Sequence, residues 1–285
     1  MQIPASFHPI IREWFSETYG EPTAVQAEAW PLIEQGKNVL ALAPTGSGKT
    51  LTAFLSAISR FVTSADGSGA QFPAGKLTVL YISPLKALNE DIKRNLLEPI
   101  DALRLRFSQA GIAFPDIRVE TRSGDTPQST RRRFLTKPPS ILAITPESLA
   151  ILLLNPRTRQ ILSGVKYLIL DEIHALLGNK RGAYLSCQID RLASVAGEFQ
   201  RISLSATIRS PQLAAEFSGG IGRQVSIVAP KAEKIIELNL MYSPAPLISR
   251  GKAIEKNITP KELRGEQNNG NSIDERWNFD STYEK

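Results

Sequence analysis

Residues 43 to 50 read APTGSGKT, and this octapeptide, together with the tetrad DEIH at residues 171 to 174, decides the fold of the chain. The octapeptide has the pattern of a phosphate-binding loop of the Walker A type, with alanine at its first position. Gly46 and Gly48 let the backbone turn so that successive N–H groups face phosphate oxygens, and Lys49 then reaches the β and γ phosphates. Thr50 opens a helix, where its hydroxyl can ligate Mg²⁺ and the helix N-terminus adds partial positive charge. The octapeptide therefore predicts a nucleoside triphosphate site.

The tetrad DEIH follows the apolar run YLIL at residues 167 to 170, which has the length of a strand buried on both faces. Its two carboxylates therefore lie at the carboxyl end of a strand, the edge at which open α/β sheets bind ligands. There Asp171 can hold Mg²⁺ while Glu172 orients the attacking water, so Asp171, Glu172 and Lys49 are the predicted catalytic residues. The alternative is that the octapeptide arises by chance and the two carboxylates only solvate a strand end. The flanking strand, glycines and helix match the context that the motif requires and favour a nucleotide triphosphatase.

The composition is typical of a globular protein. The chain has 285 residues, of which 42% are hydrophobic, enough for a sizeable core in one large domain or two small ones. No basic and then apolar leader stands at Met1, and no apolar run approaches the roughly 20 residues of a membrane span, so we expect a cytoplasmic protein with no membrane partner. The single cysteine, Cys187, excludes an internal disulfide, and with only two histidines there is no zinc-ligand cluster. We expect Cys187 to be a small buried side chain.

The formal net charge is +6, from 34 Lys and Arg against 28 Asp and Glu. Residues 231 to 285 hold nine basic and nine acidic side chains, so the whole excess lies upstream of them. A basic globular part suits a polyanionic partner, although a surplus of this size also occurs in proteins that bind none.

Short apolar runs alternate with amphipathic stretches from Asn38 to about Ala229, the pattern of a parallel sheet wrapped by helices. The predicted strands are Val39 to Ala43, Leu77 to Ser83, Ile117 to Thr121, Ile141 to Thr145, Tyr167 to Leu170, Ile202 to Ser205 and Val225 to Val228. The predicted helices include Leu51 to Phe61, Ala87 to Phe107, Ser148 to Leu154, Tyr184 to Val195 and Pro211 to Phe217. We therefore expect an α/β fold with a doubly wound, mostly parallel sheet flanked by helices.

Six short motifs occur in order along the chain: PTAVQ ending at Gln26, APTGSGKT, SPLKALNED from Ser83, TPESL from Thr145, DEIH, and SAT from Ser205. As a set they resemble the N-terminal, RecA-like motor domain of superfamily 2 helicases with a DExH box. The stretches GEPTAVQAEAW, RSGDT from Arg122 and RRRFL from Arg131 are most similar to the large helicase-related (Lhr) family. The expected organisation is an N-terminal helical segment over residues 1–36, the ATP-binding domain over 37–230, and a partly disordered connector over 231–285.

The resemblance implies ATP and Mg²⁺ as cofactors, and it makes Gln26 the residue that recognises adenine, where the plain alternative is a surface glutamine on an amphipathic helix. The residues expected around ATP are Gln26, Pro44, Thr45, Gly46, Ser47, Gly48, Lys49, Thr50 and His174, with Thr50 and Asp171 on the metal. His174 can hydrogen-bond toward the γ-phosphate or toward Ser205 and Thr207, which would couple nucleotide state to nucleic acid.

Small hydroxyl residues and helix starts follow two predicted strands, a geometry that suits nucleic-acid phosphates. The predicted nucleic-acid edge consists of Ser83, Lys86, Arg122, Gly124, Thr145 and Glu147. Helix capping is the alternative for the hydroxyl residues, and both roles can coexist. The run Arg131 to Arg133 is better explained as a solvated helix, because three adjacent side chains cannot share one helical face.

The resemblance implies the first motor domain of an ATP-dependent DNA helicase or translocase, which binds single-stranded DNA and acts in DNA repair. Such motors place ATP between two domains, and no arginine-rich motif of a second domain occurs in this chain. Because an arginine finger contributes about 10³ to 10⁵ in turnover, we expect the chain alone to bind ATP but to unwind poorly. The alternatives are an ATP-gated module that binds nucleic acid or protein, and an RNA helicase.

Overall fold

The computed structural model describes residues 3–65, 67, 72–73, 75–84, 90, 92–122, 126 and 128–230. The expected connector over residues 231–285 lies outside them. Within the described part of the chain, no helix is long and apolar enough to cross a membrane.

Seven strands form one sheet whose neighbours all pair in parallel. The strands are β1 (Asn38–Leu42), β2 (Val79–Ile82), β3 (Val119–Arg122), β4 (Ile141–Ile144), β5 (Tyr167–Leu170), β6 (Gln200–Ser205) and β7 (Val225–Val228). Their order across the sheet is β3-β4-β2-β5-β6-β1-β7. Every predicted strand is present within two residues of its predicted bounds, and the doubly wound α/β fold is confirmed, with a sheet that is parallel throughout.

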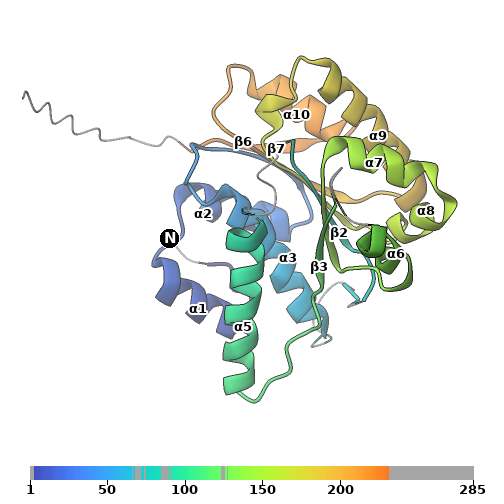
Figure 1. Cartoon of the computed structure of the whole chain (residues 1–285). Helices are drawn as coiled ribbons and strands as arrows, with labels where there is room; N and C mark the ends of the chain where they lie inside the picture. The colour runs from blue at the N-terminus through green and yellow to red at the C-terminus, as the bar shows by residue number, and fades with distance from the viewer. Residues whose placement is uncertain are drawn as a thin grey trace, which may run out of the picture. The chain divides into compact units, whose positions relative to one another are not determined.

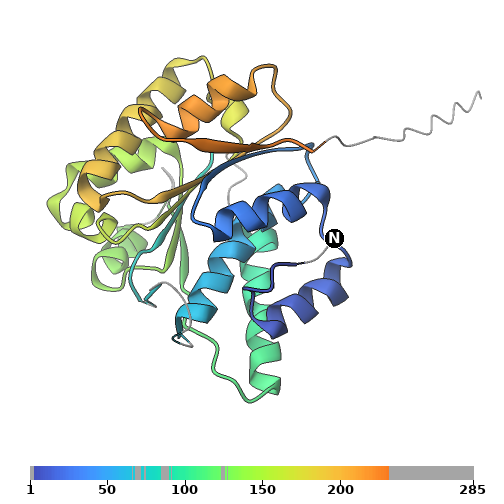
Figure 2. The same cartoon turned by 180° about the vertical axis from the view of Figure 1, so that it is seen from behind.

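Helices cover both faces of the sheet (Figures 1 and 2). One face carries α1 (Pro9–Tyr19), α2 (Ala24–Glu34), α3 (Lys49–Ala65), the π-helical turn η1 (Lys93–Leu97) and α5 (Glu98–Gln109). The other carries α6 (Gln128–Thr136), α7 (Pro146–Leu154), α8 (Pro156–Leu162), the 3₁₀ turn η2 (Ile173–Ala175), α9 (Lys180–Ala196) and α10 (Pro211–Gly219). Alternate strand residues serve the two layers: Val39 and Ala41 pack with the first, and Leu40 and Leu42 with the second. This is why the inner strands β1, β2, β4 and β5 read as largely apolar runs, whereas the edge strands β3 and β7 are only partly buried.

Two helical expectations change in the structure. The predicted helix from Ala87 to Phe107 becomes the π-helical turn η1 followed by α5, and residues 87 to 89 lie outside the described part. The expectation for Cys187 was wrong, because its side chain is exposed. Helix α9 buries Leu185, Ile189 and Leu192, a spacing of four and three residues, and Cys187 falls on the opposite face.

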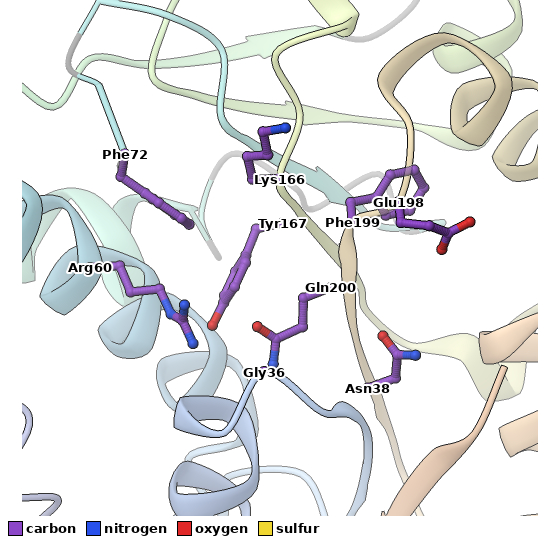
Figure 3. A pocket seen from close by; sticks show the side chains of 9 residues that line it. All are labelled: Gly36, Asn38, Arg60, Phe72, Lys166, Tyr167, Glu198, Phe199 and Gln200. Carbon is purple, nitrogen blue, oxygen red and sulfur yellow. The ribbon is translucent and has the colours of Figure 1, made fainter. Parts of the chain in front are cut away.

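The amino ends and the carboxyl ends of the parallel strands have different surroundings. A pocket lies at the amino ends of the strands, where β1, β5 and β6 begin (Figure 3). It is lined by Gly36, Asn38, Arg60, Phe72, Lys166, Tyr167, Glu198, Phe199 and Gln200. None of these residues belongs to the predicted site, whose described members, apart from Gln26 in α2, lie at or after the carboxyl ends of the strands. The chemistry of this chain is therefore to be sought at the opposite edge from this pocket.

Candidate nucleotide and nucleic-acid site

The loop between β1 and α3 has the backbone that the octapeptide predicts. Gly46 and Gly48 both have φ of 81°, in the region that side chains with a Cβ avoid. A Cβ on Gly48 would also lie 2.7 Å from Nε2 of Gln26. The buried Lys49 folds back into the loop, where its Nζ donates to the carbonyl oxygens of Ala43 and, at 2.7 Å, Pro44. Burial lowers the pKa of Lys49, against the opposing effect of the nearby carboxylates of Glu172 and Asp171.

Asp171 is 4% exposed, and its carboxylate accepts hydrogen bonds from three donors. Its Oδ2 accepts hydrogen bonds from the hydroxyls of Tyr81, at 2.7 Å, and Thr50, at 3.1 Å. Its Oδ1 accepts from the backbone N–H of Glu172 at 2.8 Å. Burial nevertheless raises the pKa of Asp171 above its ordinary value, because these hydrogen bonds do not fully offset the loss of hydration. The sheet topology brings these groups together, because parallel pairing of β2 with β5 places Tyr81 beside the strand that Asp171 follows.

Glu172 stands in a strained backbone conformation. Among the residues that the structure describes, it is the one non-glycine residue with a positive φ, at 51°. Such left-handed geometry costs of order 1–3 kcal/mol and is concentrated at functional sites. It turns the carboxylate toward His174, whose Nδ1 lies 3.1 Å from Glu172 Oε2.

His174 joins the carboxylate pair to the end of β6. Its Nδ1 lies 3.4 Å from the hydroxyl of Ser205, and the backbone N–H of Ala206 approaches the same nitrogen at 3.4 Å. The structure thus brings His174 and Ser205 together, as the sequence suggested, while the Thr207 side chain is exposed beyond them.

Gln26 is buried beneath the phosphate-binding loop. Its side chain is 3% exposed; its Oε1 accepts from the backbone N–H of Thr23 at 2.9 Å, and its Nε2 faces the carbonyl oxygen of Gly48 at 3.5 Å. The hydroxyl of Thr23 donates to the carbonyl oxygen of Ser47 at 2.9 Å. These contacts hold the start of α2 against the loop, and the role of Gln26 toward adenine stays a prediction.

The described residues of the predicted nucleic-acid edge follow three adjacent strands. Arg122 ends β3, Thr145 follows β4, and Ser83 follows β2. The Thr145 hydroxyl lies 3.1 Å from that of Ser148, which also donates to the carbonyl oxygen of Arg122 at 3.3 Å. Thr145 occupies the N-cap position of α7 without a capping bond from its side chain, so capping does not account for its hydroxyl. Lys86 and Gly124 lie outside the described residues.

Glu147 forms an ion pair that the sequence did not predict. Its carboxylate accepts two hydrogen bonds from Arg181, at 2.5 Å from Nε and 3.2 Å from Nη2. The third nitrogen of the guanidinium, Nη1, donates to the carbonyl oxygen of Pro84 at 3.0 Å. Chiefly through the hydrogen bonds from Arg181, the pKa of Glu147 is lowered. Arg181 and Tyr81 are thus the two residues at this edge that sequence reasoning missed.

The strand order divides this edge into two halves. The strands β5, β6 and β1 lead to Asp171, Ser205 and the phosphate-binding loop, whereas β3, β4 and β2 lead to Arg122, Thr145 and Ser83. One row of strand ends therefore carries a triphosphate-type site beside a row of hydroxyl and basic groups.

Comparison with known proteins agrees with this arrangement. The family described as DEAD/DEAH box helicase matches residues 23–215, which run from the start of α2 into α10. The chain belongs to the DEAD/DEAH box helicase family.

Among its relatives, this DEAD/DEAH box chain is similar to proteins named as Lhr helicases, which confirms the resemblance seen in its motifs. It is 44% identical over 247 residues to the ATP-dependent helicase Lhr-Core of Methanocaldococcus jannaschii, covering 84% of this chain and 29% of that protein. It is 41% identical over 245 residues to the Lhr helicase/uracil glycosylase of Escherichia coli, covering 85% of this chain and 16% of that protein. The chain thus spans less than a third of the length of these relatives.

Solved structures of helicases share the fold of this DEAD/DEAH box chain. Mycobacterium smegmatis helicase Lhr bound to ssDNA and AMP-PNP matches with a TM-score of 0.74 and 43% identity, over 81% of this chain and 28% of that one. The DEAD-box helicase Mss116, bound to ssRNA and UDP-BeF, matches with a TM-score of 0.62 at 18% identity, which shows the shared fold alone.

Proposed function

We propose that this chain is the first motor domain of an ATP-dependent DNA translocase or helicase of the Lhr type. The observation that carries the proposal is the cluster of Lys49, Thr50, Asp171 and Glu172 at the carboxyl edge of the sheet, next to Ser83 and Thr145 on the same edge. The structure of M. smegmatis Lhr, whose description names both ssDNA and AMP-PNP, supports a nucleotide and a single strand as the two ligands. Residues 1–36, 37–230 and 231–285 are then a helical segment, the ATP-binding domain and a connector.

The Lys49 ammonium and the loop amides bind the triphosphate in this proposal. Lys49 lies at the loop, and its Nζ, which donates to the carbonyl oxygens of Ala43 and Pro44, would donate to phosphate oxygens when the nucleotide is bound. Pro44, Thr45, Gly46, Ser47 and Gly48 supply the surrounding backbone, and Gln26 reads the adenine edge. Burial lowers the pKa of Lys49 while the carboxylates of Glu172 and Asp171 oppose that shift, and a bound triphosphate would oppose it further.

Thr50 and Asp171 fit an Mg²⁺ ion. Their side-chain oxygens lie 3.1 Å apart, and both are the hard oxygen ligands that this ion prefers. Mg²⁺ is usually held by one or two protein oxygens and completes its shell with phosphate and water. When bound, Mg²⁺ neutralises charge on the β and γ phosphates.

Glu172 orients and deprotonates the attacking water in this proposal, and His174 responds to the position of the Glu172 carboxylate. Because His174 contacts both Glu172 and Ser205 at the end of β6, a shift of the carboxylate on hydrolysis reaches Ser205 within two contacts, and Thr207 lies two residues farther along the chain. In this proposal those hydroxyls pass nucleotide state toward the nucleic-acid half of the edge.

Single-stranded DNA is the proposed second ligand, bound through its phosphates by Ser83, Lys86, Arg122, Gly124 and Thr145. DNA is favoured over RNA because two more similar structures are described with DNA: M. smegmatis Lhr at 43% identity, and a DUF1998 helicase named MrfA, bound to DNA and AMPPNP, at 25% identity with a TM-score of 0.63. The RNA-bound Mss116 is only 18% identical. The names of the M. smegmatis and E. coli relatives join a helicase to a uracil glycosylase, which supports a role in DNA repair. A second motor domain, supplying the transition-state arginines, is part of the proposal.

Steady-state ATP hydrolysis, with and without single-stranded DNA, tests the function. Lys49→Ala is expected to lose nucleotide binding, whereas Glu172→Gln should keep binding and suppress turnover, which makes it the blank. The chain alone is expected to turn over slowly, and addition of a second motor domain should raise turnover by about 10³ or more, the usual contribution of an arginine finger. Equal loss of nucleotide binding in both variants contradicts the assigned roles. DNA and nucleotide binding with no gain in turnover from the second domain would instead favour an ATP-gated binding module.

A further inference from the structure

Arg181 lies at the start of α9, a helix outside every motif of the predicted site. Its three guanidinium nitrogens all donate within the protein: Nε and Nη2 to the two carboxylate oxygens of Glu147, and Nη1 to the backbone carbonyl oxygen of Pro84. A two-point Arg–carboxylate pair fixes direction as well as distance, because the guanidinium and the carboxylate are both planar. The third bond adds a second segment of chain to the same rigid group.

The two segments that Arg181 joins are the two that flank the proposed DNA strand. Pro84 follows Ser83 at the end of β2, and Glu147 lies two residues after Thr145 at the end of β4. The strands are adjacent, with Ile82 paired to Ile144, and the backbone N–H of Ser83 donates to the carbonyl oxygen of Ile144 at 3.1 Å. Beyond that bond the sheet no longer sets their separation, and Arg181 bridges the two chain segments past the strand ends.

The backbone on either side of Arg181 is hydrogen-bonded through Asn179 to the turn that follows Glu172. The amide of Asn179 donates to the carbonyl oxygen of Ala175 at 2.8 Å and accepts from the backbone N–H of Gly182 at 2.9 Å. Gly182 packs so closely that a Cβ there would lie 1.9 Å from the carbonyl oxygen of Leu176. The first turn of α9 is therefore held against η2, the turn that directly follows Asp171 and Glu172. Arg181 thus extends from a backbone whose position relative to that turn is fixed.

We propose that Arg181 is a positioning residue for DNA binding: paired with Glu147, it sets the spacing between the Ser83 and Thr145 segments and anchors both to the turn after Glu172. The inference rests on the proposed function, because it takes this edge to be the DNA-binding edge. It also accounts for a carboxylate at an edge that binds phosphates, because the charge of Glu147 is neutralised by Arg181.

Affinity for a fluorescein-labelled oligothymidine, measured by anisotropy with saturating Mg·AMP-PNP, tests the inference in a double-mutant cycle. Arg181→Ala and Glu147→Gln are each expected to weaken DNA binding about tenfold, within the range for residues that act through others, and the double variant should be no weaker than either alone. Arg181→Lys keeps the charge but loses the planar fork, so it should restore only part of the affinity. Nucleotide affinity, measured by calorimetry, should be unchanged in all of them, which a general loss of folding would not allow.

Arg191→Ala is the matched control, because Arg191 lies on the same helix and is exposed, and its Nη1 donates to Oε1 of Gln188 within that helix at 2.9 Å. Its DNA affinity should equal that of the unchanged chain. If Glu147→Gln keeps or raises DNA affinity while Arg181→Ala lowers it, Arg181 contacts phosphate directly and the positioning role is wrong. Variants that all bind like the unchanged chain also overturn the inference but leave the proposed function standing. An unchanged chain that binds no DNA overturns the proposed function itself.

Discussion

Gly182→Ala tests the packing of α9 against the turn that follows the catalytic carboxylates. An ideal Cβ at this position lies 1.9 Å from the carbonyl oxygen of Leu176 and 2.8 Å from its carbonyl carbon, distances that real Cβ atoms essentially never show. To reach even 3.0 Å from the oxygen, the helix and the turn must separate by about 1 Å. The obstacle is backbone, so no side-chain rotation relieves it.

Two opposing energies decide the size of the effect. Alanine is favoured over glycine in a helix by up to about 1 kcal/mol. Overpacking costs about 1–3 kcal/mol, at the upper end where backbone must move. The net expectation is a loss of about 2 kcal/mol in the free energy of unfolding, which corresponds to a fall in Tm of about 4–8 °C for a domain of this size.

Urea denaturation of the variant and the unchanged chain measures this loss, and Ala183→Gly calibrates the helix-propensity contribution. Ala183 is the next residue of α9 and is exposed, so its replacement by glycine changes propensity without changing packing. A Gly182→Ala chain that is as stable as the unchanged one, or more stable, would refute the reasoning. The DNA affinity of the variant should also fall, because Arg181 is carried on the same turn.

Three further outcomes follow from the site. Asp171→Asn should raise the free energy of unfolding at neutral pH, because burial raises the pKa of Asp171 and so makes its ionised form destabilising in the folded chain. The gain should appear only as pH rises above the ordinary Asp pKa of about 4. Urea denaturation at a series of pH values should therefore show the gain vanish in acid. Tyr81→Phe removes the 2.7 Å hydrogen bond to that buried carboxylate and should cost about 1–3 kcal/mol by thermal denaturation, so an unaltered Tm would contradict the network. Thr207→Ala should keep nucleotide affinity, measured by calorimetry, while weakening its dependence on DNA; a collapse of ATP binding would place Thr207 in the nucleotide site instead.

The central strands β1, β2, β4 and β5 were predictable because they are buried on both faces and so read as apolar runs of four or five residues. The phosphate-binding loop was predictable for a different reason: two glycines with positive φ, a lysine and a threonine must stand at set spacings to cradle phosphate. Helix α8 was missed, since PRTRQIL is short and mostly polar and its burial comes from Thr158 and Leu162 alone.

The residues that sequence reasoning missed share one property, which is a partner far away in the chain. Arg181 is 34 residues from Glu147 and 97 from Pro84. Tyr81 is 90 residues from Asp171 and reads from the sequence as one more core residue of an apolar strand. Cys187 is the exception, because the spacing of Leu185, Ile189 and Leu192 was enough to place it on the exposed face.

The sequence by itself determined the fold class, the family and the chemistry of the phosphate-binding loop, because these depend on local backbone requirements and on the periodicity of burial. Only the tertiary structure decided which strand ends stand side by side. The order β3-β4-β2-β5-β6-β1-β7 places the hydroxyl residues of three strands together and the nucleotide residues of three others beside them. That order, and the bridge from Arg181 to two separate segments, depends on pairings between distant parts of the chain, and no local pattern of residues encodes them.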